Sequence, residues 1–461
     1  MTECNQSSFE FASHFSRQVT ATFDGGTITS DGGALLLREA DRKLNLLERF
    51  STCFRDHRRP DLIEHQVSEM VSQRVYGLAL GYEDINDHDR LRSDPLMGVL
   101  AGKADASGQQ RRHARDRGNA LAGKSTLNRL EQAAQHSERY CKIEYSREAI
   151  DELMIEVFLE AHPEAPAQIV LDLDATDVPL HGQQERRFFH GYYDAYCYLP
   201  LYIFCGEHVL CARLRPANID GAKGSVWEVR RLVQRIRRRW PQVRIVVRAD
   251  SGFCRQRMMG WCERHGVDYV LGLARNPRLK KLSAEAMAQA KTQAAGTGQP
   301  ARVFVEFPYA TEKTWSRERR VIAKAECLQD KENPRYVVTS LSAEEWPAQR
   351  LYEEFYCARG EMENRIKEQG MLFHDRLSTA TMRSNQLRLY FSAVAYMLVQ
   401  GLRRLALAGT ELAVAQMHTI RIRLLKIGAV VRLSARRVWL SLATGYPWQN
   451  LFREVWQALR C

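Results

Sequence analysis

The sequence predicts an α/β protein in which a mixed sheet follows a helical N-terminal region. Three observations lead to this class. Apolar residues recur at helical spacing in the first third of the chain, strands alternate with helices after Pro166, and further strand-like runs follow residue 300. A chain of 461 residues, 45% of them hydrophobic, is long enough for two or three domains of a soluble globular protein.

Residues 1–165 are predicted to form the helical domain. Apolar residues recur with the helical period over 30–50 and 61–81, and another helix is expected from Ser125, where hydroxyl side chains can cap the first turn. Between them, the Gly-, Ala- and Arg-rich segment 103–124 predicts a mobile basic loop.

Residues 166–278 predict the mixed sheet. The strand AQIVLDLDAT is followed by YLPLYIFCGEHVLCARLRP, which reads as two strands about a glycine-containing turn. A basic helix, GSVWEVRRLVQRIRRRW, then leads to a strand (VRIVVRAD), a helix (RQRMMGWCERHG) and a strand (DYVLGLA). The order β-β-β-α-β-α-β is the one that a ribonuclease-H-like core requires, and its closing helix is expected within 345–410.

Residues 279–344 are predicted to be a β-rich insertion, because RVFVEFPYA, RRVIAKAECL and RYVVTSL read as strands and separate the core from its closing helix.

Residues 411–461 form a basic C-terminal region. Lys and Arg number 67 against 55 Asp and Glu, a net charge of +12, and basic clusters recur at 111–117, 230–240, 275–281 and 421–437. A polyanionic partner, with nucleic acid as the leading candidate, is therefore expected, and the N-terminal helices are expected to contribute to its binding.

Cysteine usage and hydropathy indicate the compartment. The 11 cysteines include no C-x-x-C pair, which argues against a zinc ribbon, and their odd number favours reduced thiols. We see no signal peptide, and the longest uncharged apolar-rich run, 389–402, has 14 residues, too few to cross a bilayer. A cytoplasmic protein with no membrane partner is predicted.

Three carboxylates lie where this topology can bring them together. Asp172 and Asp174 share one face of the first core strand, and Asp250 follows the strand VRIVVRA. If these strands are neighbours, the acids converge, and Glu363 can complete an oxygen-ligand site for two Mg²⁺ ions, with Mn²⁺ as a substitute. The alternative is that the aspartates cap backbone N–H groups at strand ends.

The stretch YCARGEMENRIK places Tyr356, Arg359, Glu363 and Lys367 on one face of a helix. Such a stripe is either a solvated face with ion pairs or part of a phosphate-handling site in which Arg359 and Lys367 bind phosphate groups.

These residues resemble those of the DDE transposases of bacterial insertion sequences. One cut-and-paste group carries Tyr, two residues, Arg, three residues, Glu, six residues and Lys, and its first three positions match Tyr356, Arg359 and Glu363. The lysine position holds Gly370, so that role is either taken by Lys367 or absent.

The resemblance, which spans about 168–401, also implies roles for other residues. In that group the first acid is followed by any residue and then Thr, which matches Asp174 and Thr176 and favours Asp174 over Asp172 as the first metal ligand. The group also has a β-rich insertion that can carry a Trp stacked on a displaced base. Trp315 is the candidate, and its alternative role is that of a core aromatic.

The resemblance implies a DNA transposase in which metal-activated water cleaves the element end and the freed 3′-OH attacks target DNA in one active site. Its implied partners are the terminal inverted repeats, target DNA and further copies of the chain. The alternatives are a metal-dependent DNA nuclease and a non-catalytic DNA-binding regulator.

A second motif points elsewhere. The stretch GNALAGKS, from Gly118 to Ser125, satisfies the phosphate-loop pattern. A phosphate loop follows a buried strand, whereas QQRRHARDR precedes this one, so a basic loop before a helix is favoured over ATP binding.

Overall fold

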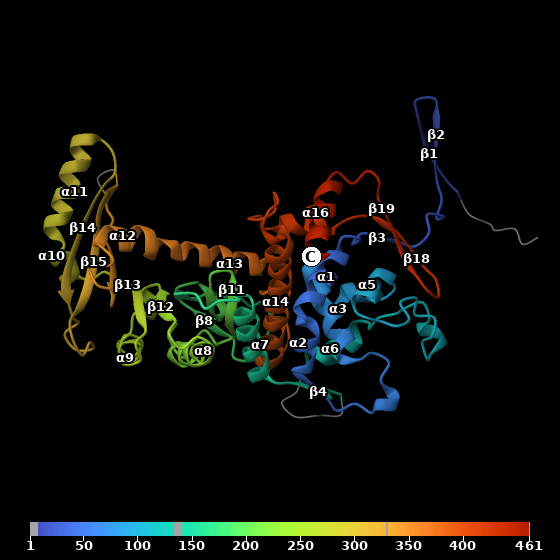
Figure 1. Ribbon diagram of the computed structural model, residues 1–461, viewed down its shortest axis with the longest axis horizontal. Coiled ribbons are helices and arrows are strands. Elements are labelled where there is room, and N and C mark those ends of the chain that lie inside the picture. The colour runs from blue at the N-terminus through green and yellow to red at the C-terminus, as the bar shows by residue number, and fades with distance from the viewer. Residues whose placement is uncertain (1–7, 133–139, 329–330, 461) are drawn as a thin grey trace, which may run out of the picture. The chain divides into compact units, whose positions relative to one another are not determined.

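The computed structural model describes residues 8–132, 140–328 and 331–460 (Figure 1). It is a mixed α/β structure that divides into two compact units. The first contains Met1–Tyr145, Met371–Phe373 and Val394–Cys461, and the second contains Ser146–Gly370 and His374–Ala393. The candidate acids all belong to the second unit.

A large mixed sheet forms the centre of the second unit, with the strand order β11-β10-β6-β12-β13-β17-β15-β14, and β16 pairs with β15. The strands are β6 (Gln168–Ala175), β10 (Leu201–Cys205), β11 (His208–Arg213), β12 (Arg244–Ala249), β13 (Asp268–Leu273), β14 (Ala301–Tyr309), β15 (Arg319–Leu328), β16 (Lys331–Glu332) and β17 (Arg335–Thr339). Strands β6, β12 and β13 run parallel, whereas β10 and β17 are antiparallel to their neighbours. The carboxyl ends of the three parallel strands therefore meet at one edge.

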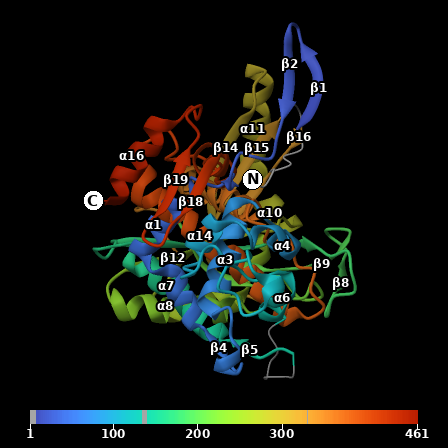
Figure 2. The same ribbon diagram turned by 90° about the vertical axis from the view of Figure 1, so that its right-hand side faces the viewer.

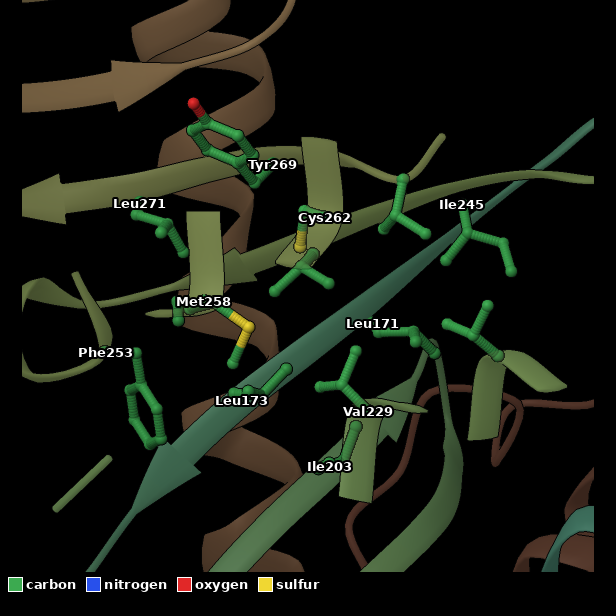
Figure 3. Close-up of a cluster of buried hydrophobic side chains, with 14 of the residues drawn as sticks. Leu171, Leu173, Ile203, Val229, Ile245, Phe253, Met258, Cys262, Tyr269 and Leu271 are labelled. Atoms are coloured by element: carbon green, nitrogen blue, oxygen red, sulfur yellow. The ribbon is translucent and has the colours of Figure 1, made fainter. Parts of the chain in front are cut away.

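Apolar side chains cover one face of this sheet together with three helices, α7 (Arg147–Glu160), α8 (Ser225–Arg239) and α9 (Gln256–Arg264). Leu171 and Leu173 of β6 pack in the same cluster as Val229 of α8 and Met258 of α9 (Figure 3). Helix α7 lies within the range predicted for the N-terminal domain, but Phe158 and its neighbours join this cluster, so α7 belongs to the second unit.

The opposite face is covered by the helical segment that follows α12 (Ala348–Arg350). Val246, Val270 and Val337 of the sheet cluster with Leu351 and Phe355 of that segment. Both faces of the central strands are thus buried, which explains their near-continuous Val, Ile and Leu content.

The block 279–344 extends this sheet. β17 pairs with β13, β15 with β17, and β14 with β15. Two helices, α10 (Pro277–Leu282) and α11 (Ala284–Thr297), precede the strands, and Ala286 and Met287 of α11 pack against Ala325 of β15. The strand pattern did not predict α11, whose alanine-rich sequence has high helix propensity.

The remaining elements of the second unit are the three-stranded sheet β7-β9-β8 and the helix α13. Their bounds are Val178–Pro179 for β7, Phe188–His190 for β8, Ala195–Tyr198 for β9 and Gly360–Gly370 for α13. The long helix α14, Met382–Leu402, continues from the second unit into the first.

The first unit combines helices with short strands. Its helices are α1 (Ala34–Leu44), α2 (Leu46–Thr52), α3 (Val67–Leu80), α4 (His88–Leu91), α5 (Pro95–Leu100), α6 (Lys124–Glu131), α15 (Met417–Ile420) and α16 (Gln449–Arg460). Its strands are β1 (Phe9–His14), β2 (Arg17–Ala21), β3 (Ile28–Thr29), β4 (Phe54–Asp56), β5 (Ile143–Tyr145), β18 (Ala429–Leu433) and β19 (Val438–Leu442). β1 and β2 pair as a hairpin (Figure 2), and β18 pairs with both β19 and β3, so the C-terminal region completes a sheet with the N-terminal one.

The N-terminal strands were not predicted, because they are two to six residues long and pair partly with distant segments. Among the residues that the structure describes, no helix has both the length and the apolar character needed to cross a membrane.

Candidate active site

Strands β6 and β12 place Asp174 and Asp250 side by side. Their parallel register pairs Asp172 with Arg248 and Leu173 with Ala249, so Asp250 follows as the neighbour of Asp174. Neighbouring strands lie about 4.8 Å apart. Asp250 comes directly after β12, and its carboxylate oxygen Oδ1 accepts a hydrogen bond from the backbone N–H of Gly252 at 2.8 Å. Both acids thus lie at the carboxyl edge of the parallel strands.

The segment that carries Tyr356, Arg359 and Glu363 is not one uniform α-helix. Leu351–Tyr356 forms a π-helical turn, Cys357–Arg359 a 3₁₀ turn, and the α-helix α13 begins only at Gly360. The period of 3.6 residues therefore does not hold across these turns.

Arg359 joins the carboxylates of two elements. Its Nη2 lies 2.7 Å from Oε1 of Glu363, and its Nη1 lies 3.8 Å from Oδ1 of Asp174. Burial raises the pKa of Asp174 to about 6; Arg359 lowers it, and the negative charges of Asp250 and Glu363 raise it. Three carboxylates and one guanidinium give a formal excess of two negative charges, which suits a cationic ligand.

The acids are not yet gathered around one point. In the part of the chain that the structure describes, no group of three or more His, Cys, Asp or Glu side chains could hold a metal ion as it stands. Glu363 is 47% exposed and its carboxylate binds Arg359. The donor chemistry fits a hard divalent cation, and the carboxylates would have to draw closer to share it.

Asp172, two residues before Asp174, has a different role. Its carboxylate binds Arg248 through two hydrogen bonds, Nε to Oδ1 at 2.6 Å and Nη2 to Oδ2 at 2.8 Å. Arg248 also donates through Nη1 to the carbonyl oxygen of Phe355. The side chains of Arg248 and Asp172 are only 9% and 7% exposed. This buried pair, which we call the Asp172–Arg248 tie, connects β6 and β12 to the helical segment above them.

Tyr356 lies against Gly272 in β13. A Cβ atom on Gly272 would stand 2.5 Å from Oη of Tyr356 and 2.9 Å from the backbone nitrogen of Ser251. Only glycine leaves this space for the phenol beside the loop that follows Asp250. The sequence signal was present, since a glycine inside a strand often marks such a close approach. Burial raises the pKa of Tyr356; Arg359 lowers it, and Asp250 raises it.

Lys367 and Trp315 are the other residues that were predicted to contact DNA. Lys367 is exposed on α13 and makes no ion pair among the described residues. Trp315 lies in the loop between β14 and β15, half-buried against the core of the sheet. Its ring meets that of Tyr309 edge-on at 5.6 Å, and the guanidinium carbon of Arg319 lies 5.4 Å from its centroid.

The phosphate-loop pattern has no strand before it. The 3₁₀ turn Ala114–Asp116 precedes the loop, and α6 begins at Lys124. The carboxylate of Asp89 accepts a hydrogen bond from the backbone N–H of Lys124 at 2.9 Å and lies 3.5 Å from its Nζ. An acid already occupies the position that a phosphate would take.

Comparison with known protein families finds a match that covers nearly the whole chain. The family model described as transposase DDE domain group 1 matches residues 11–461, which include every residue of the candidate site. No curated protein matches the chain. Among solved structures, the chain is similar to the piggyBac transposase in a cryo-EM structure of its synaptic complex with hairpin DNA. The two are 9% identical with a TM-score of 0.40, over 86% of this chain and 80% of that one.

Proposed function

Since the chain belongs to the transposase DDE domain group 1 family, and is thus an enzyme that cleaves and transfers DNA, we propose that Asp174, Asp250 and Glu363 are its catalytic carboxylates. One observation carries this assignment. Two acids stand side by side at the carboxyl edge of β6 and β12, and Arg359 connects Asp174 with Glu363 from the helical segment.

DDE transposase domains generally depend on a divalent metal, and we propose Mg²⁺ here, with Mn²⁺ as a substitute. Asp174, Asp250 and Glu363 offer the oxygen ligands that such an ion prefers. When bound, the metal would stabilise charge on the reacting phosphate and lower the pKa of the attacking hydroxyl or water. Asp174 is ionised at neutral pH even with its raised pKa, and Arg359 orients Glu363 and offers a guanidinium to phosphate.

The same proposal covers the finer architecture. The antiparallel strands β11, β10 and β6 beside the parallel strands β12 and β13 support a ribonuclease-H-like core. Tyr356, Arg359, Lys367 and Trp315 are proposed to contact DNA. The net charge of +12 supports further contacts by the N-terminal helices and the C-terminal region. We assign the terminal inverted repeats and target DNA as substrates, several copies of the chain as the working assembly, and the cytoplasm as its compartment.

The test compares Asp174→Ala, Asp250→Ala and Glu363→Ala with a control variant. The control is Glu361→Ala, which removes an exposed acid from α13, the helix that carries Glu363. End cleavage, strand joining and binding are measured on labelled DNA that carries the inverted repeats flanking the reading frame. Each of the first three changes should abolish both reactions and leave binding nearly unchanged, because affinity comes from basic residues elsewhere. Glu361→Ala should remain active.

A variant of the three that keeps near-wild-type cleavage would remove that residue from the site. Cleavage without joining in the wild-type protein would favour the nuclease alternative. Ca²⁺ should support binding but not reaction, because its looser coordination positions the reacting oxygens poorly.

A further inference from the structure

A pocket of about 340 Å³ lies where α8 and α9 begin. Its walls come from two segments, 220–227, which leads into α8, and 255–258, which begins α9. Val226, Met258 and the Trp227 indole supply apolar surface, and three cations also line the pocket, Lys223, Arg255 and Arg257.

The topology places this pocket at the edge of the sheet that carries the proposed catalytic acids. β11 is antiparallel to β10, and β10 is antiparallel to β6, so β11 runs in the same direction as β6 and β12. The segment before α8 follows the carboxyl end of β11, and the segment before α9 follows that of β12 and begins with Asp250. Ligands of α/β sheets commonly bind outside such carboxyl ends.

The side chains of the pocket are free to meet a ligand. The Trp227 side chain is 55% exposed and has no ring partner among the described residues. Lys223 and Arg257 are exposed and have no ion pair within the described ranges, whereas Arg255 pairs with Asp220 at 2.9 Å. An accessible indole beside two unpaired cations is the combination that binds single nucleotides, since the ring stacks on a base and the cations attract phosphates.

We propose that this pocket binds one nucleotide of the DNA next to the cleavage site, with its base on Trp227 and its phosphates near Lys223 and Arg257. The location relative to the cleavage site rests on the proposed catalytic role of Asp174 and Asp250. The alternative is that a second copy of the chain packs against the exposed Trp227 in this pocket. The two unpaired cations favour a polyanion over a chain with a net charge of +12.

The experiment measures binding of labelled DNA carrying the flanking inverted repeats, with single abasic positions introduced around the cleavage site. Trp227→Ala should weaken binding about tenfold, within the range for one stacked base, and Trp227→Phe should recover most of it. At one DNA position, the losses of affinity caused by the abasic change and by Trp227→Ala should not be additive, because each change removes the same contact. Lys223→Gln and Arg257→Gln should each lower the salt dependence by about one counterion.

Arg264→Gln is the matched control, because it removes the same charge from an exposed site at the opposite end of α9, outside the basic clusters. Equal losses of affinity for Arg264→Gln and Arg257→Gln would overturn the pocket in favour of a general charge effect. Wild-type affinity for Trp227→Ala, or a smaller assembly in light scattering with unchanged affinity, would also overturn it. Binding by the Trp227 variants is independent of cleavage by the Asp174 variant, so either proposal can fail alone.

Discussion

Removing one member of the Asp172–Arg248 tie separates the structural role of Asp172 from the catalytic role proposed for Asp174, two residues away. Asp172→Ala leaves the Arg248 guanidinium buried without its two carboxylate hydrogen bonds. Breaking a buried pair in this way costs about 3–5 kcal/mol of unfolding free energy. For a unit of this size each kcal/mol corresponds to about 2–4 °C, so the melting temperature should fall by about 6–20 °C.

The matched change is Asp174→Ala, which removes an acid whose pKa is already raised by burial. It should abolish cleavage and leave the melting temperature of the metal-free protein unchanged or higher. The double variant Asp172→Leu with Arg248→Met replaces the pair with apolar groups of similar volume, so most of the stability should return. The cleavage rate of this double variant should be lower than that of wild type, because no side chain at position 248 then donates a hydrogen bond to the carbonyl oxygen of Phe355.

Thermal and urea unfolding give the stability, and cleavage is measured at least 10 °C below each variant's transition. A melting temperature of Asp172→Ala within 2 °C of wild type, together with lost cleavage, would refute the structural role and make Asp172 a candidate ligand.

Four further predictions use other parts of the structure. Because the pKa of Asp174 is raised to about 6, the folded state binds more protons than the unfolded state as the pH rises from about 4 to 6, and stability falls through that window. In EDTA, the unfolding free energy of Asp174→Asn should therefore exceed that of wild type by up to about 3 kcal/mol at pH 8 and by little at pH 4. A stability difference that does not change with pH would contradict this. Gly272→Ala should lower the unfolding free energy by about 1–3 kcal/mol and slow cleavage, because its Cβ displaces Tyr356. Adding Tyr356→Phe should restore part of the stability and part of the cleavage rate. Trp315→Ala should slow cleavage more than it weakens binding, and a lower melting temperature with both activities intact would assign the ring to the core. Lys124→Ala should cleave as wild type without ATP, whereas an ATP requirement would revive the phosphate loop.

The sequence by itself was enough to predict features that depend on local pattern. Apolar runs with polar ends predicted β6 and β12 and placed Asp174 and Asp250 at their ends, because strand faces and strand ends are read from residue order. The spacing of Tyr356, Arg359 and Glu363 predicted the family and its DNA chemistry from residue order alone. An ion pair between Arg359 and Glu363, four residues apart, was one of the two alternatives left open by the sequence, and the structure contains it.

Only the tertiary structure decided which distant segments meet. Asp172 and Asp174 are equivalent in strand periodicity, and it is Arg248, 76 residues away, that makes Asp172 a buried partner. Gly272 gains its meaning from the phenol of Tyr356, and the pocket around Trp227 requires two loops from different strands. The physical reason is that periodicity specifies which face of an element is buried, while the partner across that face is set by the packing of the whole chain.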